Sequence, residues 1–501
     1  MKFKKVVYIS LISLLPLLGC NEWLDVNRDP NNLNDLSAPE AVMPVAQVSV
    51  ANALMGWHMG FTGAFWSQYW TQDHTSSQFK YLDEYDETSL DDAYENLLPG
   101  ALNDLQAIKN SSEEGSGNYL VAEALSIFTW QVVTDTWGDI PYFEALQGDE
   151  YLFSPKFDTQ EAIYEDLMTR IDALLAMDFS DAIINSDYDF VYQGDVDSWL
   201  AFTKSLKLKL MLRLSETSKF NLQEALALAN SGGFITETAM IDGSIWEDKD
   251  GKRHPMVEFD AAGYFDNVIA SMTMVRYLTS NEDPRLEKLY VPTDEGHQGS
   301  IQGDFAYQGD TDSDGTLDED EDYSTVEFDA NADIPLMSTW EVDFYLAEIF
   351  ARAGELKAKL YYDAGVNENL AYWGISETIT GEGEYAEWPN GTVEENIRAI
   401  AMQKWVAYNK LQHLEAFLER NRTKYPAISS LEISTPSDRE DAFFNFPVGE
   451  FTVSVAGLGK LSGEVPSSPI YPNAVITRNT NNPSQKTSLG ENVWWDQKAG
   501  Q

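Results

Sequence analysis

The 501-residue chain has little of several residue types, and each shortage excludes a class of protein. A single cysteine, Cys20, allows neither an intramolecular disulfide nor a cysteine-rich metal cluster. Only 33 lysines and arginines stand against 82 acidic residues, which gives a formal net charge of −49. Such a chain would repel the phosphates of nucleic acid and the anionic headgroups of a membrane surface. We therefore expect no nucleic-acid partner and no electrostatic attachment to a membrane.

Catalytic motifs are also missing. The five histidines show no His-Glu-x-x-His spacing and no close pair, so no ligand set for a zinc hydrolase is visible. Neither a Gly-x-Ser-x-Gly nucleophile elbow nor a Walker phosphate loop occurs. A glycoside hydrolase needs only two carboxylates at a set separation, and the 82 acidic residues leave that class open.

Long apolar runs are confined to the N-terminus. Three lysines precede the apolar run 6–18, which ends at Gly19-Cys20. A basic start and a short apolar run are typical of a signal peptide, and the run is too short for a permanent membrane span. A small residue before a cysteine is typical of a lipobox, so we predict a signal peptide over 1–19 and lipid attachment at Cys20. The alternative is an ordinary signal peptide followed by an unmodified cysteine.

Apolar and aromatic residues, by contrast, are abundant. They make up 43% and 12% of the chain, far more than in a disordered acidic protein. Apolar residues recur at helical spacing mainly over 89–217 and 339–420, whereas 219–335 and 425–501 contain many loop-forming residues. We predict a mainly α fold in which antiparallel helix pairs stack into a solenoid. The predicted organisation is a lipidated linker over 20–39 followed by one domain over 40–501.

Local signals refine this prediction. Asp158 with Glu161, and Thr392 with Glu395, have the spacing of a capping box at a helix start. Helical pattern returns at about 339–363 and again at 393–420. The paired tryptophans 494–495 indicate that the C-terminal segment is an ordered loop packed on the helices, because disordered acidic tails seldom carry them.

The acidic segment 310–321 fits a twelve-residue calcium loop. Carboxylates stand at positions 1, 3, 5 and 9, glycine at position 6 and glutamate at position 12. Eight carboxylates crowd into residues 310–322, which is costly without a cation. We predict a structural Ca²⁺ ion bound by Asp310, Asp312, Asp314, the carbonyl of Thr316, Asp318 and Glu321. The alternative is a solvated acidic hairpin.

Aromatic side chains are dense between residues 61 and 81, where amides, carboxylates and a histidine separate them. Carbohydrate sites use this mixture, because flat rings stack on sugars while polar groups bind hydroxyls. The predicted ligand-binding residues are Trp66, Tyr69, Trp70 and His74, together with Trp246 and Trp388 from loop-like segments. The alternative is that these rings pack in the core or between domains, since an aromatic stripe at helical spacing commonly does so.

Six short motifs occur in order along residues 20 to about 480. They are Cys20 with Val-Asn-Arg-Asp-Pro-Asn (26–31), Thr-Trp-Gly-Asp-Ile-Pro-Tyr-Phe-Glu-Ala (136–145), Asn-Glu-Asp-Pro-Arg-Leu (281–286), Thr-Trp-Glu-Val-Asp-Phe-Tyr-Leu-Ala-Glu-Ile (339–349), Ile-Ala-Met-Gln-Lys-Trp (400–405) and Glu-Arg-Asn-Arg-Thr-Lys-Tyr-Pro (419–426). Together they resemble the SusD/RagB family of outer-membrane lipoproteins, particularly its second SusD-like subgroup. Two departures are Asn421, which splits an arginine pair usual in the family, and a late element present only as Ser-Pro-Ile-Tyr-Pro (468–472).

The resemblance implies a helical scaffold of the tetratricopeptide (TPR) type with an irregular, loop-rich half that binds the ligand. It also implies display on the outer membrane, with contact to the membrane only through the lipid anchor, and a SusC-like TonB-dependent transporter as partner. The expected activity is capture of an oligosaccharide or polysaccharide and its delivery to that transporter, with no bond made or broken. The same family with a peptide cargo, as RagB-like members suggest, and a surface glycoside hydrolase are the alternatives.

Overall fold

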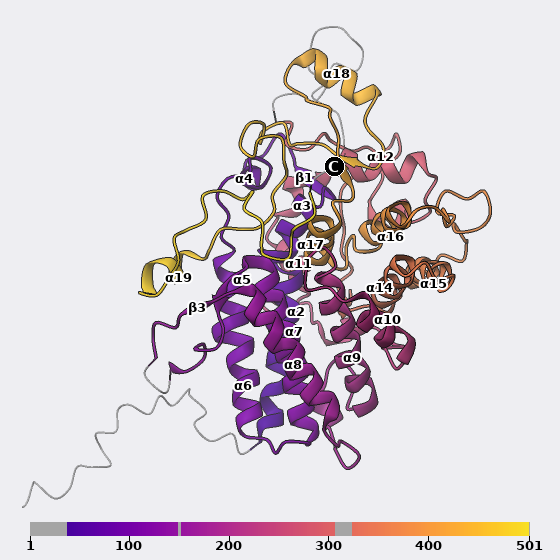
Figure 1. Cartoon of the computed structure of the whole chain (residues 1–501). Helices are drawn as coiled ribbons and strands as arrows, with labels where there is room; N and C mark the ends of the chain where they lie inside the picture. The colour runs from indigo at the N-terminus through magenta and orange to yellow at the C-terminus, as the bar shows by residue number, and fades with distance from the viewer. Residues whose placement is uncertain (1–37, 149–151, 306–322, 500–501) are drawn as a thin grey trace, which may run out of the picture. The chain divides into compact units, whose positions relative to one another are not determined.

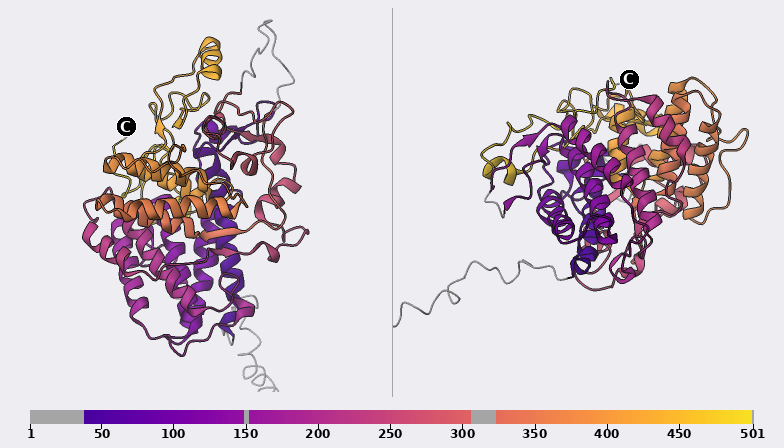
Figure 2. Two further views of the ribbon diagram at one scale, coloured as in Figure 1. Left: turned by 90° about the vertical axis from the view of Figure 1, so that its right-hand side faces the viewer. Right: turned by 60° about the horizontal axis from the view of Figure 1, so that its bottom comes forward.

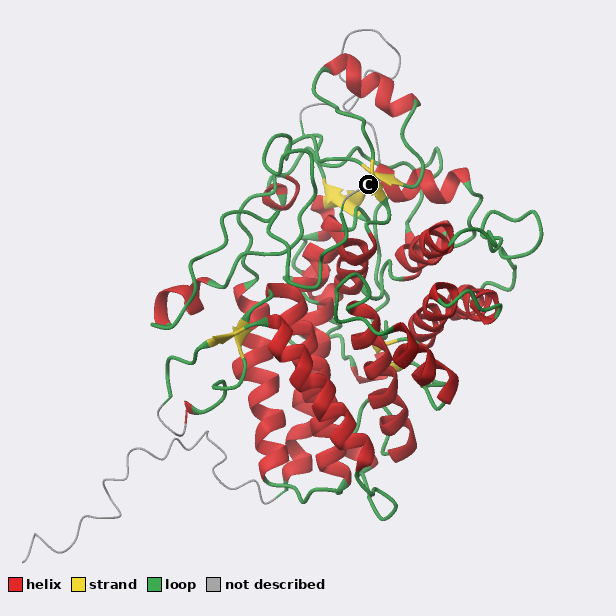
Figure 3. Ribbon diagram, viewed as in Figure 1, coloured by secondary structure: helices red, strands yellow, loops and turns green. Residues whose placement is uncertain are grey.

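The computed structural model describes residues 38–148, 152–305 and 323–499. The chain divides into two compact units, Met1–Pro39 and Glu40–Gln501. The second unit holds the helices and strands described below, and helices dominate it, with short strands and long loops between them (Figures 1 and 3). The predicted mainly α fold is confirmed.

The first helices form a bundle around α7 (Gly117–Trp137) (Figure 1). This helix begins after Ser116, whose hydroxyl accepts a hydrogen bond from Tyr119 N, and it ends at Gly138, whose φ is 85°. Almost all of α7 is buried because it packs against α6 (Asn103–Asn110), α8 (Gln160–Ala176) and α9 (Val196–Arg213). α7 also contacts α2 (Met43–Met55) and the π-helix η3 (Asn96–Leu102), while α3 (Met59–Trp66) packs on α2 and α5 (Asp91–Glu95) packs on η3.

Later helices extend this bundle: α10 (Leu222–Ser231), α14 (Thr339–Arg352), α15 (Lys357–Tyr372), α16 (Val393–Ala407) and α17 (His413–Thr423). α14 and α15 form a helical hairpin that turns at Gly354, whose φ is 70°. α14 also packs on α9, α10 and α16, while α17 packs on α3 and α16. The predicted helical pattern over 339–363 and 393–420 is confirmed, and each range holds parts of two helices that fold back on each other.

The two predicted capping boxes have different outcomes. The Thr392 hydroxyl accepts from Glu395 N while the Glu395 carboxylate accepts from Thr392 N, so this capping box is confirmed. The second is wrong by one residue, because Thr159 caps α8 by accepting from Ala162 N. Asp158 instead lies in a strand, and its carboxylate accepts from the backbone N–H groups of Tyr142 and Phe143.

Short strands tie distant segments together, and each sheet in the described residues has two strands. β1 (Trp70–Gln72) pairs with β5 (Val268–Ala270), so that Trp70 faces Ala270, and β2 (Ile140–Pro141) pairs with β3 (Phe157–Asp158), both antiparallel. β4 (Ala239–Ile241) is antiparallel to β6 (Ile334–Met337), and β7 (Ala427–Ile428) is parallel to β8 (Glu450–Phe451). The β1–β5 pair brings the segment after α3 to the loops of the 260s.

The loop-rich half contains only short helices, which are α4 (Lys80–Asp83), α11 (Pro255–Ala261), α12 (Met272–Ser280), α13 (Leu286–Leu289), α18 (Pro436–Phe444) and α19 (Asn473–Arg478). Single turns of 3-10 helix are η2 (Pro39–Val42), η5 (Ser186–Tyr188), η6 (Gly243–Ile245) and η7 (Phe265–Asn267). Figures 1 and 2 place α18 at the end of the Glu40–Gln501 unit opposite the α6 to α9 bundle. The C-terminal segment is packed as predicted: Trp495 is fully buried, and its Nε1 donates to Asp135 at 2.8 Å.

Candidate functional site

Three of the predicted ligand-binding aromatics lie in the core. Trp66 is 4% exposed, and Tyr69 and Trp70 are 0% exposed. The Tyr69 hydroxyl donates to Trp405 O at 2.5 Å, and Trp70 packs edge-on against His413 with ring centroids 4.8 Å apart. These rings present no face to a ligand in this structure. The physical reason is that α3 packs on α17, and the aromatic stripe fills that interface.

The other three predicted residues differ in exposure. Trp246 and Trp388 are 9% and 8% exposed; Trp246 Nε1 donates to Ala332 O, and Trp388 packs against Tyr362. Both rings therefore serve packing more than ligand contact. His74 follows β1 and keeps 20% of its side chain exposed, with Nδ1 3.6 Å from the Asp73 carboxylate. Burial lowers the pKa of His74, and Asp73 opposes that shift.

His74 belongs to a polar surface beside the β1–β5 sheet that we call the loop face, formed by Asp73, His74, Gln78, Lys80 and Phe305. Asn267 Nδ2 donates to Gln78 Oε1 at 3.0 Å, which fixes this surface to the turn before β5. Lys80 Nζ lies 4.7 Å from the centroid of the Phe305 ring, a cation–π contact. The loop face thus combines carboxylate, amide, imidazole and ammonium groups with an aromatic ring.

A buried carboxylate holds the backbone from which the loop face projects. Asp83 Oδ2 accepts from Thr71 Oγ1 at 2.9 Å and from Gln72 N at 3.0 Å, while Oδ1 accepts from Gln302 Nε2 at 2.5 Å. We call Asp83, Thr71, Gln72 and Gln302 the loop core. All of these donors are neutral, and burial raises the pKa of Asp83 to about 7 in spite of the hydrogen bonds. The loop core joins β1, α4 and the segment that leads to Phe305.

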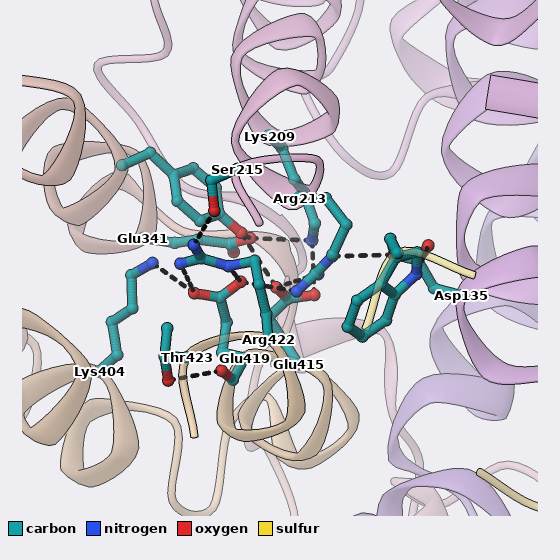
Figure 4. Close-up of polar contacts among 12 residues, drawn as sticks. Asp135, Lys209, Arg213, Ser215, Glu341, Lys404, Glu415, Glu419, Arg422 and Thr423 are labelled. Carbon is teal, nitrogen blue, oxygen red and sulfur yellow. Dashed lines mark hydrogen bonds and ion pairs between the residues drawn. The ribbon is translucent and has the colours of Figure 1, made fainter. Parts of the chain in front are cut away.

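The helical half buries a large set of charges that we call the ion network: Lys209, Arg213, Lys404 and Arg422 with Asp135, Glu341, Glu348, Glu415 and Glu419. Figure 4 labels all of these residues except Glu348. Arg213 reaches Asp135 at 3.0 Å, Glu415 at 2.5 Å and Glu419 at 2.6 Å. Arg422 reaches Glu348 at 2.6 Å and Glu419 at 2.8 Å. The ion network therefore connects α7, α9, α14, α16 and α17.

The cations of the ion network lower the pKa of Glu348, Glu415 and Glu419. Burial alone would raise the pKa of Glu348, but Arg422, Arg352 and Lys404 lower it to about 2. The same competition, with Arg422, Lys404 and Arg213 as the cations, lowers the pKa of Glu419 well below its usual value. Asp135 differs, because burial raises its pKa in spite of Arg213 and Tyr164. Almost every side chain of the ion network is buried. The network therefore has a structural role and holds these helices together.

A cavity of about 390 Å³ opens on the helical half, and we call it the tail pocket. Its lining comes from α8, the end of α9, the start of α10 and the C-terminal segment: Glu161, Tyr164, Glu165, Met168, Thr169, Met211, Leu214, Lys219, Phe220, Asn221, Glu224 and Trp494. The Tyr164 and Trp494 rings lie with centroids 6.2 Å apart. Tyr164 also donates to Asp135 at 2.5 Å, so the tail pocket and the ion network share a wall.

Two predicted sites fall outside the described residues. Cys20 and the predicted calcium ligands (310–321) both lie there. Within residues 38–148, 152–305 and 323–499, no group of His, Cys, Asp and Glu side chains is arranged to hold a metal ion. Among the same residues, no helix is both long and apolar enough to cross a bilayer.

The sequence interpretation missed the ion network and, apart from His74, the residues of the loop face. A signal for the network was present, because Glu341 and Glu348 lie seven residues apart on the otherwise apolar face of α14. Charged residues on a buried helix face are rare unless they are paired. Lys80 and Phe305 carried no such signal, since only the folded chain brings them together.

Comparisons with known proteins agree on the fold. A family model described as "Starch-binding associating with outer membrane" matches residues 30–443. A search of curated proteins gives no match. A solved SusD homolog from Bacteroides uniformis is 19% identical with a TM-score of 0.70, and the match covers 91% of this chain and 99% of that one.

Two further solved structures are similar over nearly their whole length. A chitin-binding SusD homolog from Flavobacterium johnsoniae is 19% identical with a TM-score of 0.67, covering 92% of this chain and 98% of that one. A SusD/RagB family protein from Bacteroides thetaiotaomicron is 19% identical with a TM-score of 0.66, covering 93% and 99%. At this identity the likeness establishes a shared fold.

Proposed function

Because the chain belongs to the SusD-like family, whose model matches residues 30–443, we propose that it is a cell-surface lipoprotein that captures oligosaccharides and passes them to a SusC-like TonB-dependent transporter. SusD-like proteins are non-catalytic binding proteins, so the glycoside hydrolase alternative is set aside. The family match carries the proposal, since its description joins starch binding to the outer membrane. The chitin-binding homolog from Flavobacterium johnsoniae supports a glycan as the cargo.

The loop face is the surface that best suits this cargo. Sugar rings stack on aromatic faces, and their hydroxyls bind to carboxylate, amide and amine groups held in place by the fold. Phe305 provides the ring, while Asp73, Gln78 and Lys80 provide the polar groups. The Asp73 carboxylate already accepts from Thr75 N at 2.7 Å, so it is oriented before a ligand arrives. We assign the first sugar contacts to the loop face and not to Trp66, Tyr69 and Trp70.

Affinity electrophoresis against a panel of neutral polysaccharides tests this proposal. At least one glycan should retard the wild-type protein, and the substitutions Phe305→Ala and Lys80→Ala should weaken that retardation. Phe143→Ala, which removes a half-exposed ring in the helical half, is the matched control and should change nothing. No retardation by any glycan would contradict the proposal.

A separate experiment distinguishes a peptide cargo from a glycan cargo. Native mass spectrometry of the protein purified from its cells would show bound peptides if the cargo were a peptide, and bound oligosaccharides if the proposal is correct. Peptides in every preparation, with no glycan retardation, would replace the glycan with a peptide in the same delivery role.

The anchor and the transporter are tested in the membrane. Lipid on Cys20 would hold the protein at the outer membrane without a spanning helix, because several acyl chains bind stably where one does not. Cys20→Ser should release the protein from the membrane fraction. Mild-detergent purification of the lipidated protein should bring a TonB-dependent transporter with it, and a preparation free of such a transporter would contradict the partnership.

The calcium proposal rests on the residue pattern of 310–321. A ligand that binds only the folded state must raise its stability. Chelation of calcium should therefore lower the thermal midpoint of the wild-type protein and leave that of Glu321→Gln unchanged. A wild-type midpoint that does not respond to chelator would eliminate the structural ion.

A further inference from the structure

The tail pocket is a preformed cavity that the glycan proposal does not use. Its lining residues come from α8, α9, α10 and the segment around Trp494, and none of them belongs to the loop face. A volume of about 390 Å³ lies within the range of small-molecule sites. The cavity is therefore large enough for a ligand with an aromatic or branched apolar body.

The floor and walls of the tail pocket are apolar. Met168, Met211 and Leu214 supply the flexible side chains, and methionines adapt to ligands of different shape. Phe220 and Trp494 supply rings at the wall. Apolar atoms of a ligand would be removed from water against these five residues, which is the main source of affinity in such cavities.

The rim of the tail pocket is acidic. Glu161, Glu165 and Glu224 share the rim with Lys219, whose Nζ lies 2.7 Å from Glu161 and 2.9 Å from Glu165, and Arg352 Cζ lies 5.8 Å from the centroid of the Phe220 ring. Asn221 Nδ2 donates to Glu224 at 2.7 Å. The rim donors are thus already committed to rim carboxylates, and the polar atoms left for a ligand are mainly carboxylate oxygens. Such a rim accepts hydrogen bonds from a ligand and attracts positive charge.

The wall of the pocket is held rigidly from behind. Tyr164 donates to Asp135 Oδ1 at 2.5 Å, and Trp495 Nε1 donates to the same atom at 2.8 Å. Asp135 in turn accepts from Arg213 Nε at 3.0 Å. Because Trp494 is the neighbour of Trp495 in the chain, the ion network fixes the position of the Trp494 wall. A ligand would bind without the cost of ordering that wall.

We propose that the tail pocket binds an organic monocation, a primary ammonium or guanidinium group carried on an apolar or aromatic body. The body enters between Phe220 and Trp494, and the cation lies among the rim carboxylates. Anions are disfavoured by the rim and by the net charge of −49. This function is separate from glycan capture, and either could fail without the other.

Three matched probes test the proposal on the mature full-length protein by ligand-observed NMR titration: tryptamine, the neutral tryptophol and the anionic indole-3-acetate. Tryptamine should bind most tightly and indole-3-acetate most weakly. Glu165→Gln should weaken tryptamine by about threefold, the size expected for one solvent-exposed charge pair. Lys219→Met should tighten tryptamine by a similar factor, because it frees Glu161 and Glu165 for the ligand. Trp494→Leu should remove most binding of all three probes.

Glu382→Gln, an exposed substitution outside the pocket, is the control and should bind tryptamine like the wild type. Equal affinity for the three probes, or no binding of tryptamine, would overturn the proposal. So would a Lys219→Met variant that binds tryptamine no better than the wild type. If Trp494→Leu does not fold, the solvent-exposed substitutions at Glu165 and Lys219 still decide the result. No glycan enters the experiment, so its outcome is independent of the glycan proposal.

Discussion

The ion network and the loop core both contain buried carboxylates, but the groups that bind these carboxylates differ in charge. In the ion network, arginines and lysines lower the pKa of Glu348, Glu415 and Glu419, that of Glu348 to about 2. In the loop core, the donors to Asp83 among the described residues are neutral, and burial raises its pKa to about 7. The pKa of Glu348 therefore lies far below neutrality, while that of Asp83 lies close to it. A scaffold needs the first property, and a surface that captures and releases cargo can tolerate the second.

The largest expected effect comes from breaking the ion network. Arg422→Met leaves Glu348 and Glu419 without their principal cation, and removing one partner of a buried pair costs about 3–5 kcal/mol. Urea unfolding followed by circular dichroism should show this loss. Arg253→Met, which removes an arginine paired with exposed Asp248 and Asp250, is the control and should leave the urea midpoint unchanged. Equal changes of the urea midpoint in the two variants would show that the buried ion network stabilises the protein no more than a surface ion pair does.

The loop core predicts a pH dependence of stability. Folded Asp83 binds a proton up to about pH 7, whereas the unfolded side chain loses it near its ordinary pKa of 3.8. Stability must therefore fall as the pH rises from about 4 to 7 and level off above, by roughly 4 kcal/mol at most for this group. Urea midpoints at pH 5, 6, 7 and 8 should fall more steeply for the wild type than for Asp83→Asn.

The comparison with Asp83→Asn separates the contribution of Asp83 from that of other buried acids whose raised pKa also makes stability fall as the pH rises. Burial raises the pKa of Asp343 to about 8, and both proteins share that contribution. Asp86→Asn, at a carboxylate that is 47% exposed and paired with Lys460, should follow the wild-type curve. Parallel curves for the wild type and Asp83→Asn would show that Asp83 is ionised throughout.

A smaller effect is expected where the C-terminal segment meets the ion network. Trp495→Phe removes the hydrogen bond to Asp135 and part of a fully buried ring, which should cost about 1–3 kcal/mol. Trp494→Phe keeps that hydrogen bond and should cost less. Thermal midpoints of the two variants measure the difference, and a larger loss at position 494 would contradict the account of how the C-terminal segment is held.

The sequence predicted the helices and the ordered C-terminal segment because local periodicity and aromatic content determine them. It did not predict the break at Gly354 or the turn between α16 and α17, since apolar spacing continues across both. It predicted Trp66, Tyr69 and Trp70 as ligand contacts because core aromatics and ligand-binding aromatics share one composition. Only the packing of α3 on α17 decides between the two roles. The loop face depends on contacts between distant segments, which no local pattern encodes.

The smallest change in stability and the largest change in function should come from the loop face. Phe305→Ala removes a half-buried ring at the surface and should leave the urea midpoint nearly unchanged. The decisive measurement is the affinity of wild type, Phe305→Ala and Trp494→Ala for the polysaccharide that retards the wild type most. Our account predicts that Phe305→Ala loses most of this affinity while Trp494→Ala keeps it. Full affinity in Phe305→Ala, with loss in Trp494→Ala, would contradict it and move glycan binding to the helical half.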